Sequence, residues 1–247
     1  MTVGKFDVTA DTYDTHAKIQ RQVAYNLLSF LQNMNKQNFG NVLDIGAGSG
    51  FLSEMLERSS KFRKIVSLDI SYNFLRTNKN PFRVNCDALR MPFKKGSFDT
   101  VLSSSAIHWI DDFNLLLKEI DHLLNSNGVL AFNVFLKGTF SEMEEVCKIT
   151  GFGNILNMRN SSYYENLLIS NGFDVEFMSE DRDTVLFDSV RKFLATHKMT
   201  GASLKAKKMT GKESYTKFIN YYNKLYAIKN LIPVSYNVGY FICKKKK

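Results

Sequence analysis

The sequence lacks the features that mark secreted, membrane-spanning and metal-stabilised proteins. Its 247 residues include three cysteines, Cys86, Cys147 and Cys243, without metal-ligand spacing. An odd number of cysteines in this pattern predicts free thiols in a reducing compartment, and no metal site is expected. No uninterrupted apolar run approaches membrane-spanning length, and the start of the chain lacks the apolar core of a signal peptide. These absences predict a cytoplasmic protein.

Acidic residues are the scarcer charged type. The chain has 33 Lys and Arg against 24 Asp and Glu, a formal charge of +9, and Lys244–Lys247 contribute four of the positive charges. A second basic cluster comprises Lys205, Lys207, Lys208 and Lys212. Such a surface attracts polyanions and speeds their encounter by about 10-fold or more at low salt. Nucleic acid, anionic lipid and an acidic protein are alternative partners, and a solvated face without a partner is a fourth interpretation.

The most informative segment that is present runs from Val42 to Gly50, with the sequence VLDIGAGSG. An apolar strand leads into three alternating glycines, where the backbone can turn sharply and a ligand can approach closely. Phe51 stands where the dinucleotide-binding fingerprint needs a third glycine, and no Gly-Lys-Ser/Thr closes a P-loop. The segment therefore predicts a nucleotide-type ligand at the carboxyl end of the first strand of an open α/β sheet.

Three acidic residues accompany the ends of consecutive predicted strands. Asp44 lies two residues before the first glycine, where a carboxylate suits an amino group or a sulfonium. Asp69 ends the next strand, where an acid can hydrogen-bond both ribose hydroxyls. Asp87 follows the third strand and can accept from an adenine amino group, while Leu89 packs on the ring. The alternative for each acid is a helix cap or a solvated loop end.

Hydrophobic periodicity predicts strands that alternate with helices, which indicates a mostly parallel, helix-flanked sheet. The predicted strands are 41–45, 65–69, 83–86, 98–103 and 129–132, followed by 175–177, 184–187 and 236–243. The predicted helices are 10–33, 141–149, 163–170, 190–196 and 214–229. One further helix places Leu115, Leu116, Ile120 and Leu123 on its buried side and is ended by Asn127–Gly128.

Two segments are candidates for contact with a second substrate. Tyr13, His16 and Gln20 fall on one helix face, which indicates either a lid over the ligand or an exposed polar surface. The fourth strand leads into Ser103–Trp109, whose tryptophan lines an acceptor pocket or anchors the next helix. The acid- or Asn-Pro-Pro-aromatic motif of amino-methylating enzymes and the Pro-Cys nucleophile of cytosine methylation are both absent. Their absence argues against a nucleic-acid substrate.

The glycine loop, Asp69 and Asp87-Ala88-Leu89 together resemble the class I S-adenosylmethionine-dependent methyltransferases. The resemblance implies one Rossmann-like α/β domain over 1–247, with a seven-stranded, mostly parallel sheet, flanking helices and a closing antiparallel hairpin. It divides the domain into an N-terminal lid (1–38), a cofactor-binding core (39–135) and a substrate-side elaboration (136–247). The residues it implies for S-adenosylmethionine are Gln20, Asp44, Gly46, Ala47, Gly48, Gly50, Asp69, Ile70, Asp87, Ala88, Leu89 and Ser105.

Over nearly its whole length the chain is similar to the malonyl-acyl carrier protein O-methyltransferases of biotin synthesis. The similarity rests on residues 13–20, the motifs above, 103–109, 138–143, 193–202 and 232–236. Two departures are His108, where glutamine is expected, and Asn127–Gly128, which replaces Pro-Gly.

That similarity implies methylation of the malonyl carboxylate on an acidic acyl carrier protein. Tyr13 and His16 are expected to position the substrate, and Arg182 or Arg191 to pair with its carboxylate. The alternatives are another small-molecule methyltransferase, such as one acting on a quinone carbon, a non-catalytic scaffold and a nucleic-acid methyltransferase.

Overall fold

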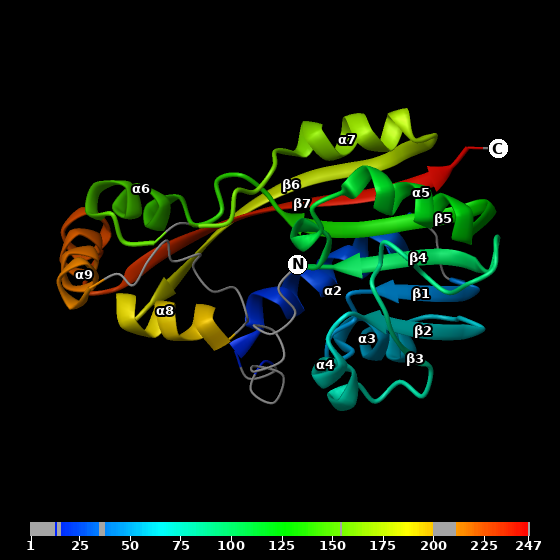
Figure 1. The fold of residues 1–247 in the computed structure, drawn as a ribbon, viewed down its shortest axis with the longest axis horizontal. Helices are drawn as coiled ribbons and strands as arrows, with labels where there is room; N and C mark the ends of the chain where they lie inside the picture. The colour runs from blue at the N-terminus through cyan, green and yellow to red at the C-terminus, as the bar shows by residue number, and fades with distance from the viewer. Residues whose placement is uncertain (1–12, 14–15, 35–37, 154, 200–210, 247) are drawn as a thin grey trace.

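The computed structural model describes residues 13, 16–34, 38–153, 155–199 and 211–246. Its centre is a seven-stranded sheet with the strand order β3-β2-β1-β4-β5-β7-β6 (Figure 1). The first five strands are parallel, and β7 runs antiparallel between β5 and β6. The predicted seven-stranded, mostly parallel sheet with a closing antiparallel pair is therefore confirmed. The strands are β1 (Asn41–Ile45), β2 (Lys64–Asp69), β3 (Arg83–Asn85), β4 (Phe98–Ser104), β5 (Leu124–Phe135), β6 (Phe173–Phe187) and β7 (Ile232–Lys245).

Helices cover both faces of this sheet. Successive strand residues point to opposite faces, so Val42 of β1 enters one apolar cluster and Leu43 enters the other. Helices α5 and α7 contribute to the cluster of Leu43, whereas α2, α3, α6, α8 and α9 contribute to the cluster of Val42. Figure 1 shows α6, α8 and α9 gathered at one end of the long strands β6 and β7. The helices are α2 (Lys18–Asn33), α3 (Phe51–Ser59), α4 (Tyr72–Thr77), α5 (Phe113–Leu123), α6 (Ser141–Thr150), α7 (Ser161–Ser170), α8 (Val190–Met199) and α9 (Lys212–Tyr226), with a 3-10 turn at Ile107–Trp109.

None of these helices combines the length and the apolar character needed to cross a bilayer. The three cysteines are free thiols, of which Cys147 and Cys243 are buried.

Two predictions around β5 were wrong. Asn127–Gly128 does not end a helix: α5 ends at Leu123 and β5 begins at the next residue. The pairing of β4 with β5 jumps from Phe98–Leu124 to Thr100–Val129, so residues 125–128 form a bulge within the strand. On the buried side of α5, Leu116, Ile120 and Leu123 are confirmed, whereas Leu115 was wrong: it is 39% exposed, and Leu117 is buried instead.

The strands of the second half are longer than predicted. Residues 175–177 and 184–187 belong to one 15-residue strand, β6, which pairs with β7 along almost its whole length. The polar run between the two predicted strands alternates between exposed and half-buried positions from 178 to 182, as a strand with one covered face requires, and Asp183 is exposed as well. Strand β7 begins four residues before the predicted 236 and includes Pro233. Helix α2 begins at Lys18 rather than at residue 10, and residues 10–12 lie outside the described part of the chain.

Candidate active site

The glycine loop folds back so that the end of β1 lies against the start of the 3-10 turn after β4. The amides of Gly46 and Ala47 both donate to the Leu68 carbonyl of β2, at 2.8 and 3.0 Å. Gly46 has a φ of +69°, and a Cβ there would lie 2.2 Å from the Cβ of Ala106. Glycine is therefore required at this position by both conformation and space.

Asp69 connects the glycine loop to the start of α4. One carboxylate oxygen accepts from the Gly48 amide at 2.9 Å, and the other accepts from the Ser71 amide at 2.8 Å. Ionised carboxylate oxygens accept hydrogen bonds, so Asp69 has the chemistry to receive one from a ligand hydroxyl. Asp69 also lines the cavity described next, so this predicted site residue both shapes the loop and faces the ligand space.

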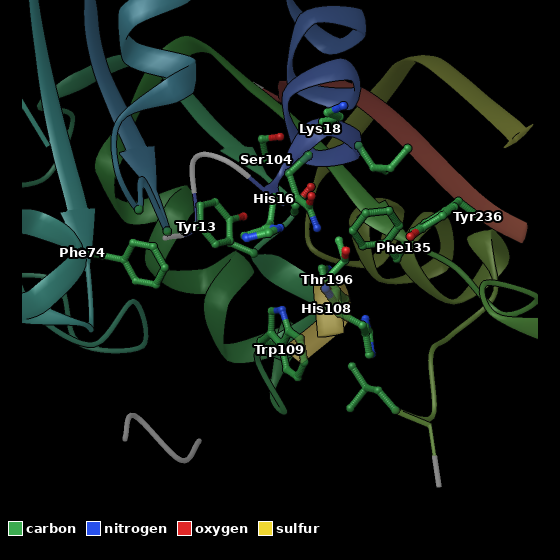
Figure 2. Close-up of a pocket in the computed structure, with 18 of the residues that line it drawn as sticks. Tyr13, His16, Lys18, Phe74, Ser104, His108, Trp109, Phe135, Thr196 and Tyr236 are labelled. Atoms are coloured by element: carbon green, nitrogen blue, oxygen red, sulfur yellow. The ribbon is translucent and has the colours of Figure 1, made fainter. Parts of the chain in front are cut away.

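A cavity of about 500 Å³ opens at the carboxyl ends of β1, β2 and β4 (Figure 2). Its first half contains most of the residues predicted for a cofactor. They come from α2, the glycine loop and the ends of three strands: Gln20, Gly46, Gly48, Asp69, Ile70, Asp87, Ala88 and Ser105. Tyr13 and His16, which were predicted to position the acceptor, line the cavity beside them.

Asp44 lies in a small side chamber that shares Tyr13, Gln20 and Gly46 with the main cavity. It is 2% exposed, and one of its oxygens accepts from the Ser53 hydroxyl at 3.0 Å. Burial raises the pKa of Asp44 to about 7, the Ser53 hydrogen bond opposes this rise, and the charge of Asp69 adds to it. A cationic group in the chamber would favour the ionised carboxylate.

Aromatic contacts hold the N-terminal segment over the glycine loop. The Tyr13 ring stacks on Phe51 with centroids 5.9 Å apart and meets Phe74 edge-on at 5.0 Å. The Tyr13 carbonyl accepts from the Ala17 amide at 2.9 Å, so Tyr13 and His16 occupy one helical turn just before α2. Tyr13, His16 and Gln20, which were predicted to share one helix face, all line the cavity.

The second half of the cavity is mainly aromatic and apolar, and much of it comes from elements after β4. Figure 2 shows Phe135 and Tyr236 side by side, with Trp109 on the opposite wall from them. The His108 ring meets Phe135 edge-on at 5.3 Å, and burial lowers the pKa of His108 to about 3. His197 packs edge-on against Phe140 at 4.6 Å, and burial lowers its pKa to about 4. Both imidazoles are therefore neutral near pH 7.

Some predicted residues do not reach the cavity. Leu89 packs against the apolar cluster beneath the loop instead of lining the ligand space. Ala47 lines only the side chamber, and Gly50 caps the start of α3 with a φ of +95°. Neither Arg182 nor Arg191 lines the cavity: the first donates to the Ser141 hydroxyl at 3.5 Å, and the second lies 5.8 Å above the Tyr215 ring.

The cations that line the cavity, within the described part of the chain, are Lys18 and Lys192. Sequence reasoning missed both of them, along with Phe193, Thr196 and His197, which share α8 with Lys192. The only available signal was the position of α8 in a segment similar to a known family, and Gly201 and Ala202 of that segment lie outside the described residues.

Comparison with known proteins agrees with this geometry. Residues 43–132 match the family described as "Methyltransferase domain". A protein from Legionella pneumophila named malonyl-[acyl-carrier protein] O-methyltransferase is 26% identical, over 95% of this chain and 87% of the relative. A protein from Ilyobacter polytropus with the same name followed by "1" is 28% identical, over 98% of this chain and 93% of the relative.

Solved structures share the fold. The YcgJ protein from Bacillus subtilis superposes with a TM-score of 0.65 at 13% identity, over 90% of this chain and 99% of that one. A phosphoethanolamine N-methyltransferase from Haemonchus contortus, solved with S-adenosyl-L-methionine, gives 0.58 at 20% identity, over 90% of this chain and 53% of that one.

The sheet order, the glycine loop with its strand-end acids and the matched domain together define the class: the chain is an S-adenosylmethionine-dependent methyltransferase with the class I fold. Within that class, its sequence is similar over almost its full length to proteins named malonyl-[acyl-carrier protein] O-methyltransferase.

Proposed function

We propose that this chain methylates the free carboxylate of a malonyl group carried as a thioester on an acyl carrier protein, in the cytoplasm. The observation that carries the proposal is the similarity to malonyl-[acyl-carrier protein] O-methyltransferases over 95% or more of the chain. The two halves of the cavity support it, because each suits one of the two substrates.

The first half fits S-adenosylmethionine. Gly46 packs too closely on Ala106 to carry a Cβ, and the backbone of Gly46 and Gly48 lines the cavity directly. Asp44 faces the space in which a positively charged amino group or sulfonium would be stabilised, while Asp69 and Asp87 have oxygens that can accept from hydroxyl or amino groups. Bound S-adenosylmethionine supplies an electrophilic methyl group. Gln20, Asp44, Gly46, Gly48, Asp69, Ile70, Asp87, Ala88 and Ser105 are the residues proposed to hold it.

The second half fits an acceptor that needs positioning rather than deprotonation. A malonyl carboxylate is ionised at pH 7, so transfer of a methyl group to it requires no general base. His108 and His197 have pKa values lowered by burial to about 3 and about 4, so they are weak bases. This argues against His108 or His197 as the general base of a carbon methyltransferase.

The residues of the chain orient the acceptor and exclude water. Alignment of the reacting groups contributes about 7–11 kcal/mol to such reactions. Tyr13 and His16 are proposed to position the acceptor at the boundary between the two halves. Lys18 and Lys192, rather than the predicted arginines, are proposed to attract its negative charge. The aromatic side chains of Trp109, Phe135 and Tyr236, which line this half of the cavity from two sides, are proposed to limit access of water.

Mass spectrometry of the product tests the proposal. Purified protein is incubated with S-adenosylmethionine and malonyl-acyl carrier protein, and the carrier is weighed. We expect a gain of one methyl ester on the malonyl group and no gain on an acetyl-loaded carrier, which lacks the free carboxylate. Absence of a methyl ester at every enzyme concentration, from protein that binds the donor, would reject the acceptor assignment.

A further inference from the structure

A line of buried polar side chains leads from the loop after α4 to Asp44. The Asn80 amide nitrogen donates to the Ser67 hydroxyl at 2.9 Å, the Ser67 and Ser53 hydroxyls are 3.1 Å apart, and Ser53 donates to Asp44 at 3.0 Å. None of the four side chains is more than 6% exposed. We call these four residues, Asn80, Ser67, Ser53 and Asp44, the Asn80 relay.

The direction of every hydrogen bond in the relay follows from its ends. The side-chain oxygen of Asn80 accepts from the backbone amide of Phe82 at 3.0 Å. This contact fixes the side-chain nitrogen of Asn80 toward Ser67 and the Ile65 carbonyl. Ser53 has one hydroxyl proton and donates it to the Asp44 carboxylate, so Ser53 must accept from Ser67. All the donors therefore point toward Asp44.

The same loop also holds the glycine loop. The side-chain nitrogen of Asn78 donates to the Gly48 carbonyl at 3.3 Å, and its side-chain oxygen accepts from the backbone amide of Asn80 at 2.9 Å. A Cβ on Gly50 would lie 2.7 Å from that Asn78 oxygen. Asn78 and Asn80 thus connect one turn to two parts of the donor half of the cavity.

We propose that Asn80, acting through Ser67 and Ser53, is a positioning residue that orients the Asp44 carboxylate and stabilises its charge toward the methyl donor. The inference rests on the proposed function, because it needs a cationic ligand in the side chamber. Charge-assisted hydrogen bonds are about twice as strong as neutral ones. A chain of aligned donors strengthens each member further.

The surroundings of Asp44 explain why this support matters. Asp69 at the end of β2 is the charged group that acts on it, and its negative charge opposes ionisation, as burial does. Tyr13 and Gln20 from the N-terminal side, Ser49 from the glycine loop and Ser104 from β4 are the other polar side chains that line the chamber, and none of them is a cation. Among the described residues, Ser53 is the side chain that donates a hydrogen bond to the Asp44 carboxylate.

Calorimetric binding of S-adenosylhomocysteine to the full chain between pH 5.5 and 8.5 tests the proposal. In the unaltered protein, affinity is expected to fall as the pH drops through about 7, where Asp44 gains a proton. Ser53→Ala removes the hydrogen bond that lowers this pKa, so the midpoint should rise by about one to two pH units. Asn80→Ala should move it in the same direction by less.

Ser103→Ala is the matched control. Ser103 is a fully buried serine on β4 that donates to the Ile45 carbonyl at 2.8 Å and lies outside the relay. The Ser103→Ala variant should leave the midpoint of the pH dependence of binding unchanged, even if its melting temperature changes. If Asn80→Ala does not fold, Ser67→Ala interrupts the relay and leaves the Asn80 hydrogen bonds to Ile65 and Phe82 in place.

The outcomes separate the two proposals. If the unaltered protein gives no binding heat at any pH, the donor site and the proposed function fail together. If it binds but Ser53→Ala and the relay variants keep its midpoint, the relay inference alone is overturned. Raised midpoints in the relay variants, with an unmoved midpoint in Ser103→Ala, support the inference.

Discussion

At the scale of single residues, Gly46 provides a direct test of the donor site. An alanine there combines a left-handed backbone conformation, which costs about 1–2 kcal/mol, with a Cβ placed 2.2 Å from Ala106. Forcing an extra carbon into a packed position costs about 1–3 kcal/mol more. We expect Gly46→Ala to weaken S-adenosylhomocysteine binding at least about 10-fold, measured by calorimetry, because the glycine loop must shift by roughly the size of a methyl group.

Gly96→Ala is the control for this effect. Gly96 has a similar φ of +66°, but no atom lies within 4 Å of the position of an added Cβ. It should lower the melting temperature through backbone strain alone and leave donor affinity unchanged. Equal donor affinity in the two variants would show that the contact between Gly46 and Ala106 does not shape the site.

His108 makes a prediction about acid stability. Its pKa is about 3 in the folded protein and about 6.5 when unfolded, so between these values the unfolded chain binds a proton that the native chain does not. The free energy of unfolding therefore falls as the pH drops below 6.5. Between pH 7 and pH 5 the loss from His108 is about 2 kcal/mol. Denaturant titrations at both pH values should show His108→Gln losing that much less than the unaltered protein.

Subtracting the acid loss of the unaltered protein from that of the variant cancels contributions common to both, including that of Asp44, whose raised pKa acts in the opposite direction. His122→Gln, at an exposed position on α5, is the matched substitution. It should lose as much stability on acidification as the unaltered protein. The same acid loss in His108→Gln would mean that burial of this imidazole does not contribute.

At the scale of elements, the predictions from sequence succeeded where a local pattern determines the structure. Strand β1 was predicted to the residue, because an apolar run between two glycines has one reading at that length. Strand β6 was not recognised as one strand, because the charged segment Glu180–Asp183 interrupts the apolar pattern although its backbone stays paired with β7. The Asn127–Gly128 dipeptide is a turn signal, but here it lies in a bulge that the pairing with β4 determines.

The candidate site divides in the same way. The acids and glycines of the donor half lie at strand ends, where the order of the sheet brings them together, so their positions could be predicted. The acceptor half depends on where α8 packs. Phe193 and His197 reach the cavity because α8 is held against Phe140 and Tyr222. Periodicity identifies the buried face of a helix, but it does not identify the element that the face contacts.

The role of α8 as a cavity wall leads to a paired substitution. Phe193 and Phe173 are both fully buried, but only Phe193 lines the cavity. Alanine would cost about 3–5 kcal/mol at either site, so the smaller change to leucine is preferable. We expect Phe193→Leu and Phe173→Leu to lower the melting temperature similarly. Steady-state kinetics should show a KM for the carrier-linked substrate that rises several-fold only in Phe193→Leu. A similar KM in both variants would remove α8 from the acceptor site.

At the scale of the whole molecule, the basic residues differ in how near they lie to the cavity and in the acidic side chains that pair with them. Lys244, Lys245 and Lys246 pair with Glu176, Asp121 and Asp174 at distances of 3.6, 3.0 and 3.2 Å. Because β7 is antiparallel to β5, this end of the chain lies at the edge of the sheet opposite the cavity (Figure 1). The terminal lysines therefore contribute little at the cavity because of their distance from it. Lys18 and Lys192 are the lining cations among the described residues, and Lys192 pairs with Asp188, which also lines the cavity.

This arrangement predicts which charges assist the encounter with an acidic carrier protein. Attraction between exposed charges is screened beyond about 8 Å at physiological ionic strength, so kcat/KM for malonyl-acyl carrier protein should fall as salt is added. Replacing Lys18 and Lys192 together by alanine should lower kcat/KM at low salt and flatten its salt dependence, because cations near the mouth act on the approaching carrier. Lys246→Ala, which removes a cation paired at the opposite edge, should keep the original slope. A slope that changes with Lys246 but not with the cavity lysines would place carrier docking at the other end of the sheet, and a rate indifferent to salt would exclude electrostatic steering.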